Sequence, residues 1–329
     1  PNAVHLHHVG TRVGSQLSFE KALEGKSVLI TGGTGSFGRY VVRELLKSNA
    51  SKITVFSRDE EKQWEMSREF ADERMRFVIG DVRDRERVFE VLHADYVYHA
   101  AALKIIPCCE ANPTEAYKTN LVGTLNVRDA CLANRVERAI LISTDKAVKP
   151  VNTYGMSKAL AEKVWLMRHP ATVFTVVRYG NVIGSRGSVV PYFRNLLKEK
   201  KPLPITHPSM SRFLLTLHQA IELIFHATLT GLGGQVFVRK SPACKVTDLA
   251  RAIAGPNYPI VEIGVRPGEK IAEVLISEEE IRRTEDQNEY YVVHPYGSYD
   301  SSARDEFTSD TARQLTVSEI ASTLRENGL

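Results

Sequence analysis

The chain has 329 residues, 43% hydrophobic and 25% charged, so it can bury the core of a globular protein and is not predicted to be disordered or fibrous. Its formal net charge is only +4, which predicts no nucleic-acid surface. No apolar run reaches the roughly 18 residues of a membrane span, so the sequence predicts a cytoplasmic protein without a membrane span.

Residues 1–24 are predicted to form an arm that precedes the fold. His5, His7 and His8 lie in this arm and could in principle hold a metal, but we expect no metal site. The four cysteines contain no Cys-x-x-Cys pair. We therefore expect free thiols, neither a zinc site nor disulfides.

From Lys26 onward, short β-branched runs alternate with longer amphipathic stretches. The predicted strands cover residues 26–31, 52–57, 75–80, 95–100, 138–143 and 174–179, with helices such as 37–48 and 113–134 between them. Repeated βαβ units predict an α/β fold, a Rossmann-type doubly wound parallel sheet in residues 25–180. Residues 181–329 are richer in Gly, Pro and Arg loops, and we expect them to form mostly a smaller substrate-binding lobe with a C-terminal extension.

The first predicted strand runs into "TGGTGSFG" and then into a helix. In this context the glycines are typical of a dinucleotide-binding turn. Gly32 would form the tight turn, Gly35 would let the pyrophosphate approach, and Gly38 would let the helix pack closely. The Gly-x-x-Gly-x-x-Gly spacing resembles that of short-chain dehydrogenases, and the alternative is a generic glycine-rich turn.

Ser57 and Arg58 follow the second strand, where an NAD enzyme would present a carboxylate to the ribose. A guanidinium there suits a 2′-phosphate, so the sequence favours NADP over NAD. Asp59 follows directly and leaves a contact with a ribose hydroxyl open. Asp81 and Val82 after the third strand are predicted to lie beside the adenine.

Tyr154 and Lys158 are four residues apart and share one face of a predicted helix. A lysine ammonium beside the phenol, together with the positively charged nicotinamide, would lower the tyrosine pKa from near 10 and make the phenolate a usable base. As an isolated pair, the motif would equally suit a surface helix. Its position after the dinucleotide turn and the "STD" strand end indicates catalysis.

Lys146 directly follows Asp145, where a carboxylate is more common in enzymes that also remove a proton from carbon. Oxidation of a sugar at C4 makes the C5 proton acidic, so a base can remove it while an acid expels the C6 hydroxyl. Lys146 would have to be neutral to act as that base, which requires burial or cationic neighbours. Alternatively, Lys146 pairs with a carboxylate or with cofactor phosphates.

Several motifs together resemble one family, the inverting UDP-N-acetylglucosamine 4,6-dehydratases of bacterial surface-sugar pathways, within the extended short-chain dehydrogenases. The resemblance runs from about Leu23 to Ile276 and rests on "LITGGTGSFG", "FSRDE", "IGDVRD", "HAAALK", "ISTDKA", "YGMSK", "RYGNVIGSRGSVVP", "SRF" and "RPGEK". In such proteins an Asp-Lys pair replaces the Asp-Glu pair of dehydratases that retain C5 configuration. The resemblance implies a tightly bound, recycled NADP, a UDP-sugar substrate and a homo-oligomer, either a dimer or a hexamer.

The resemblance also implies roles for particular residues. Thr144 would bind a sugar hydroxyl, Tyr154 with Lys158 would serve oxidation at C4, Asp145 would assist loss of water, and Lys146 would handle the C5 proton. Cofactor contacts would fall on Gly32, Thr34, Gly35, Ser36, Phe37, Gly38, Ser57, Arg58, Asp59, Lys62, Asp81, Val82, Ala100, Ala101, Lys104, Tyr154 and Lys158. Substrate contacts would fall on Lys104, Thr119, Asn120, Thr144, Asn181, Val189, Arg212 and Arg266.

Two family histidines are replaced in this chain, by Ile105 in "ALKIIP" and by Ala272 in "EKIAE". The region "EYYVVHPYG" is similar to a neighbouring branch related to dehydratase/5-epimerases and 4-epimerases. A UDP-sugar 4-epimerase is therefore the main alternative to the dehydratase. A cofactor-binding scaffold without turnover is the alternative from another class.

Overall fold

The computed structural model describes residues 19–184, 188–297 and 305–329. Most of the expected arm, including its three histidines, lies outside these ranges. The end of that arm packs into the core, because Leu23 is fully buried and the Phe19 ring stacks on Phe225 with centroids 3.5 Å apart. No helix in the described ranges is long and apolar enough to cross a membrane. All four cysteines are free.

The molecule is built around a nine-stranded sheet in the order β14-β15-β10-β6-β5-β4-β1-β2-β3. The first six strands in the chain follow the Rossmann order 3-2-1-4-5-6 and pair in parallel. They are β1 (Ser27–Thr31), β2 (Lys52–Ser57), β3 (Met75–Ile79), β4 (Tyr96–His99), β5 (Arg138–Thr144) and β6 (Val173–Tyr179). The six strands predicted from the sequence are thus confirmed, and so is the doubly wound α/β fold.

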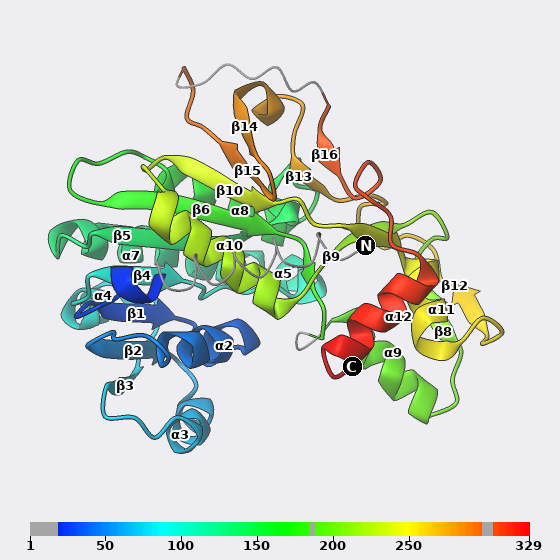
Figure 1. Ribbon diagram of the computed structural model, residues 1–329, viewed down its shortest axis with the longest axis horizontal. Helices are drawn as coiled ribbons and strands as arrows, with labels where there is room; N and C mark the ends of the chain where they lie inside the picture. Colours follow the sequence, from blue (N-terminus) through cyan, green and yellow to red (C-terminus); the bar gives the residue numbers. More distant parts are fainter. Residues whose placement is uncertain (1–18, 185–187, 298–304) are drawn as a thin grey trace, which may run out of the picture.

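Helices cover both faces of this sheet because its central strands are apolar on both sides (Figure 1). In β1, Val28 and Ile30 pack on one face, with α2 and α10, whereas Leu29 packs on the other, with α4, α7 and α8. The helices in the first part of the chain are α2 (Ser36–Leu45), α3 (Glu60–Glu69), α4 (Arg85–Val91), α5 (Ile106–Ala111), α6 (Pro113–Tyr117), α7 (Gly123–Ala133) and α8 (Thr153–Trp165).

The long helix predicted over 113–134 is interrupted by a π-helical turn, Lys118–Val122, which separates α6 from α7. Such turns insert a residue into the helical ladder and often occur at functional sites. This turn lies beside the candidate site described below, because Thr119 lines its cavity.

The rest of the chain alternates between the sheet and a smaller lobe. Helix α10 (Leu217–Thr230) and strands β10 (Gln235–Arg239), β14 (Thr284–Gln287) and β15 (Tyr290–Val293) belong to the sheet layer. Strand β10 continues the parallel order, and β15 and β14 add an antiparallel edge. The expected lobe of residues 181–329 therefore also contributes to the sheet.

The lobe has its own small cores and lies beside the carboxyl-end edge of the sheet, at the right of Figure 1. Its elements are β7 (Asn181–Val182), α9 (Val189–Lys198), β8 (Leu203–Ile205), β9 (Ser211–Leu215), β11 (Ala243–Lys245), α11 (Val246–Ala254), β12 (Ile260–Glu262) and α12 (Val317–Glu326). Strand β13 (Val274–Ile276) pairs with β16 (Phe307–Thr308), and a 3-10 turn (Glu280–Arg283) precedes β14.

Buried charges fix this C-terminal region to the sheet. Arg178 of β6 pairs with Glu162 of α8 at 2.6 Å and with Glu280 of the 3-10 turn at 3.0 Å. Burial opposes the charge of Glu280, but Arg178 outweighs it and lowers the pKa of Glu280 to about 2. The segment that links β13 to β14 is thereby held against the strand and helix that carry the candidate site.

Candidate active site

A cavity of about 1340 Å³ lies at the carboxyl ends of β1 to β6, between the sheet and the lobe. This exceeds the roughly 300–1,000 Å³ of an ordinary small-molecule pocket, so the space suits two ligands side by side. Most of the predicted site residues line it: Gly32, Thr34, Gly35, Ser36, Phe37, Ser57, Arg58, Asp59, Lys62, Asp81, Val82, Ala100, Ala101, Lys104, Thr119, Thr144, Lys146, Tyr154, Lys158, Asn181, Val189, Arg212 and Arg266. Gly38, Asn120 and Asp145 lie outside this lining.

Steric contacts require glycine at two positions of the turn after β1. Gly32 has φ +65°, and a Cβ there would lie 2.8 Å from the backbone of Ala101. A Cβ on Gly38 would lie 2.2 Å from the carbonyl oxygen of Gly33, so Gly38 lets α2 pack onto the turn. Helix α2 begins after Gly35 and presents its N-terminal turn to the cavity, the arrangement that favours a phosphate.

The end of β2 presents a cation to the cavity. The Arg58 guanidinium is half exposed, and its Nη1 lies 3.4 Å from Oδ2 of Asp81. Asp59 instead caps α3, where its carboxylate accepts a hydrogen bond from the Lys62 amide at 3.0 Å and pairs with the Lys62 ammonium. The sequence left Asp59 as a possible contact to a ribose hydroxyl. In the structure its carboxylate is already engaged within the first turn of α3.

Asn120 supports the cavity wall from behind. Its side-chain oxygen accepts a hydrogen bond from the Leu103 amide at 2.8 Å, and its nitrogen donates to Leu103 O and to Ser157 Oγ, each at 2.9 Å. These bonds fix the loop after β4 against α8. The neighbouring Thr119 hydroxyl is buried and has no hydrogen-bond partner within the described protein, so it can accept one from a ligand.

Tyr154 and Lys158 lie on the first turns of α8, which Asn152 caps by accepting a hydrogen bond from the Gly155 amide at 2.7 Å. The predicted lowering of the tyrosine pKa relies on the nicotinamide charge as well as on Lys158, and the protein's own groups alone do not produce it. Burial raises the pKa of Tyr154 to about 12 and outweighs Lys146 and Thr144, which lower it. Burial also lowers the pKa of Lys158 to about 8, while its ammonium donates to Ile142 O at 2.8 Å.

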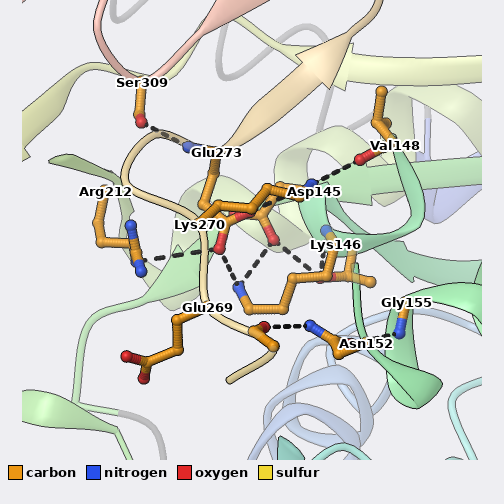
Figure 2. Close-up of polar contacts among 12 residues, drawn as sticks. Asp145, Lys146, Val148, Asn152, Gly155, Arg212, Glu269, Lys270, Glu273 and Ser309 are labelled. Carbon is orange, nitrogen blue, oxygen red and sulfur yellow. Dashed lines mark hydrogen bonds and ion pairs between the residues drawn. The ribbon is translucent and has the colours of Figure 1, made fainter. Parts of the chain in front are cut away.

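Asp145 and Lys146 form a buried cluster with a third residue, Glu273 (Figure 2). The Lys146 Nζ lies 3.0 Å from Oδ1 of Asp145 and 3.2 Å from Oε1 of Glu273. Thr144 Oγ1 donates to the same Asp145 oxygen at 2.9 Å. The second oxygen of Asp145 is fully buried and has no hydrogen-bond partner in the described protein.

Burial and ion pairing together set the charge states in this cluster. Burial disfavours the Lys146 ammonium, yet Asp145 and Glu273 outweigh it and raise its pKa, so the resting protein has the carboxylate pairing that the sequence left open as the alternative. Burial raises the pKa of Asp145, which favours a protonated acid. Burial also opposes the charge of Glu273, but Lys146, Arg212 and Lys270 outweigh it and lower its pKa. The resting cluster therefore holds the Lys146 ammonium between the carboxyl groups of Asp145 and Glu273.

Glu273 comes from residues 266–273, called the strap, which crosses the carboxyl end of β5. Asn152 Nδ2 donates to Gly268 O at 2.7 Å, and Lys270 Nζ donates to Val148 O at 2.6 Å (Figure 2). Glu273 is not among the residues predicted from the sequence, although it ends the "EKIAE" stretch. No local signal identifies this glutamate, because Lys146 lies 127 positions earlier in the chain.

The lobe side of the cavity carries Arg212 and Arg266. Arg212 Nη1 donates to Ile271 O at 3.1 Å, and Arg266 pairs with Glu269 at 2.8 Å while remaining 60% exposed. Ile105, one of the two positions where a family histidine is replaced, lines the cavity and is 59% exposed. Within the described residues no group of His, Cys, Asp and Glu could hold a metal ion.

The strand order, the glycine turn and the Tyr154–Lys158 pair place the protein in the class of extended short-chain dehydrogenase folds. The chain belongs to the polysaccharide biosynthesis protein family, whose profile matches residues 28–295.

Individual relatives carry two kinds of name. A Campylobacter jejuni (serotype O:23/36, strain 81-176) protein named UDP-N-acetylglucosamine 4,6-dehydratase (inverting) is 45% identical over 279 residues, which are 82% of this chain and 83% of that protein. A Rickettsia canadensis (strain McKiel) protein named UDP-glucose 4-epimerase is 42% identical over 320 residues, 90% of this chain and 94% of that protein. The predicted resemblance to the inverting dehydratases is thus confirmed, and epimerase-named proteins are similarly close.

The solved structure of Pen from Bacillus thuringiensis matches with a TM-score of 0.87 and 35% identity, over 92% of this chain and 98% of that one. This similarity extends over both the sheet and the lobe. The arrangement of sheet and lobe is therefore shared with a solved protein.

Proposed function

We propose that the protein is an NADP-dependent dehydratase that converts UDP-N-acetylglucosamine to a UDP-4-keto-6-deoxy-hexosamine with inversion at C5, for surface-glycan or nucleotide-sugar biosynthesis. The names of the Campylobacter relatives and of the family support this assignment. The observation that carries it is the Asp145–Lys146–Glu273 cluster beside Tyr154. Elimination of water needs an acid and a base in addition to the groups that oxidise C4, and epimerisation at C4 needs neither.

The roles divide along the geometry of the site. Tyr154 would take the proton of the C4 hydroxyl, with Lys158 below it on α8 and Thr144 holding a sugar hydroxyl. Asp145 is the buried acid whose raised pKa suits protonation of the leaving C6 hydroxyl. Lys146 lines the cavity, so its amine can reach the C5 proton.

The cavity fits a nicotinamide dinucleotide. The turn after β1 leaves no room for a Cβ at Gly32, and the first turn of α2 faces the cavity, as in dinucleotide-binding sites. When bound, this cofactor would accept two electrons from C4 and return them at C6. Arg58 would hold the 2′-phosphate of NADP, and Asp59 is occupied as a helix cap, so NAD is the less favoured cofactor.

The nucleotide sugar would lie between the sheet and the lobe. Its diphosphate would meet Arg212 and Arg266, whose guanidinium groups suit phosphate oxygens. The remaining proposed substrate contacts that line the cavity are Lys104, Thr119, Thr144, Asn181 and Val189. Asn120 is proposed to support the substrate site indirectly, through its hydrogen bonds to Leu103 and Ser157. A homo-oligomer and a cytoplasmic location stay predictions from the sequence.

Product mass tests the assignment. Purified protein with UDP-N-acetylglucosamine should give a product lighter by one water, with solvent deuterium at C5 and inverted configuration there. Lys146→Ala should reduce the cofactor transiently but lose water far more slowly. The assignment fails if the product keeps the substrate mass, or if Lys146→Ala dehydrates at the native rate with the same C5 configuration.

A UDP-sugar 4-epimerase is the second candidate, because the epimerase-named Rickettsia protein aligns over 320 residues, 90% of this chain, whereas the dehydratase-named protein aligns over 279 residues, 82% of this chain. It predicts a C4 epimer of unchanged mass. A scaffold without turnover would bind NADP tightly and convert no UDP-hexose.

A further inference from the structure

Glu273 is a buried carboxylate, 2% exposed, that faces three cations. Its Oε1 lies 3.2 Å from Lys146 Nζ and 3.9 Å from Arg212 Nε, and its Oε2 lies 3.6 Å from Lys270 Nζ. Its amide donates to Ser309 Oγ at 2.9 Å (Figure 2), which fixes the backbone at the start of β13. Glu273 lines the cavity, and the reaction as proposed above gives it no role.

The reaction needs a proton acceptor for Lys146. An ammonium cannot take the C5 proton, so Lys146 must first release one of its own. Among the described residues, its carboxylate partners are Asp145 and Glu273. Asp145 must keep its proton for the leaving hydroxyl, which leaves Glu273.

We propose that Glu273 is a positioning residue that accepts a proton from Lys146 and so converts it to the amine that removes the C5 proton; this rests on the dehydratase function proposed above. The proton passes from Nζ to Oε1 across 3.2 Å, which leaves a neutral amine and a carboxylic acid. The amine then takes the C5 proton. The C5–H electrons form the C5=C6 bond, the C6–O bond breaks, and the Asp145 proton completes the departing water.

In the protein without substrate, the surroundings favour the ion pair of Lys146 and Glu273. Lys270 and Arg212 favour the carboxylate form of Glu273, whereas burial favours the neutral pair. Asp145 and Tyr154 are the other titratable groups near Lys146. A substrate that fills the cavity removes water from the ion pair and shifts the balance toward amine and acid.

Glu273→Gln is the direct test, because glutamine is similar in shape but cannot accept the proton. Cofactor reduction by UDP-N-acetylglucosamine should persist, whereas water loss and deuterium entry at C5 should slow by about 100-fold. The native elimination should vary little between pH 7 and 9, since its proton transfer is internal. The variant should gain about tenfold per pH unit, because Lys146 must then lose its proton to solvent.

A second readout needs no turnover. Without the Glu273 charge the buried ammonium loses a stabilising partner, so its pKa should fall. Acylation of Lys146 by an amine-reactive ester, followed by mass spectrometry of the protein without substrate, should therefore be faster in Glu273→Gln than in the native protein. Glu278→Gln is the matched control, because Glu278 lies just after β13, is 74% exposed and contacts only Lys149 among the ion pairs of the described residues.

Glu273→Asp retains a proton acceptor one methylene farther away and should recover part of the elimination rate; it also serves if the glutamine variant does not fold. The proposal is overturned if Glu273→Gln eliminates water within threefold of the native rate with the native pH profile, or if cofactor reduction falls as much as elimination. Failure of the dehydratase function itself would be distinct, since the native protein would then release no dehydrated product.

Discussion

The two walls of the cavity have different origins. The sheet wall consists of residues that directly follow parallel strands, so these residues belong to short sequence motifs such as "TGGTGSFG" or "STDKA". The opposite wall includes the strap, residues 266–273, whose tethers reach back to Val148 and Asn152. One half of the site therefore follows from local sequence, whereas the other half depends on long-range contacts that hold an irregular segment in place.

Loss of the Arg178–Glu280 ion pair, which holds the segment after β13 against the sheet, should give the largest effect. Glu280 lies in the 3-10 turn after β13 and pairs with the buried Arg178 at 3.0 Å. Glu280→Gln should lower the free energy of unfolding by about 3 kcal/mol, because it leaves part of a buried charge uncompensated. Urea unfolding measures this, and Glu279→Gln, at an exposed pair with Arg283, should cost no more than about 0.5 kcal/mol.

The same ion pair should fail in acid. The pKa of Glu280 is lowered from 4.5 to about 2, so its contribution is complete above about pH 4.5 and is lost as pH falls toward 2. The difference in stability between native protein and Glu280→Gln should therefore shrink over that window. An equal difference at neutral pH and at about pH 2 would exclude the ion pair as its cause.

Arg58 tests whether the sheet wall selects the cofactor. Arg58→Ser should weaken NADP binding by about 10-fold to 100-fold and leave NAD binding nearly unchanged, because only NADP carries the 2′-phosphate that a guanidinium would pair with. Titration calorimetry with each dinucleotide measures both affinities. Arg85→Ser is the control, since Arg85 is exposed, pairs with Asp129 and does not line the cavity. Equal losses for the two dinucleotides would place Arg58 outside cofactor selection.

The sequence could predict the fold and the first wall because both depend on local patterns. Apolar runs that are buried on both faces define β1, β2, β4, β5 and β6, and the positive φ of Gly32 explains why the turn after β1 needs glycine. It could not predict Glu273 or the charge state of Lys146. A lysine between two carboxylates is cationic, and one of those carboxylates arrives from 127 positions later in the chain, so only the folded arrangement reveals it.

The same limit explains Asn120 and the π-helical turn. An asparagine in a helix is a plausible ligand by type, yet here its amide is fully engaged with Leu103 and Ser157. The turn Lys118–Val122 depends on how α6 and α7 pack against the sheet and α8, and no periodicity in residues 113–134 marks it.

Asn152 joins the two walls and gives the smallest and most selective test. Its oxygen caps α8 through the Gly155 amide, while its nitrogen donates to Gly268 O of the strap, both at 2.7 Å. Asn152→Ser should keep the cap, since serine is also a good N-cap residue, but it is too short to reach the strap. Stability should then change by less than about 0.5 kcal/mol, while KM for the UDP-sugar rises about threefold, because one hydrogen bond of about 1 kcal/mol no longer holds the segment that carries Arg266. Asn152→Ala removes both bonds and should add about 1 kcal/mol of destabilisation. Chemical denaturation and steady-state kinetics on both variants separate the two effects, and an unchanged KM in both would mean that the strap needs no tether to α8.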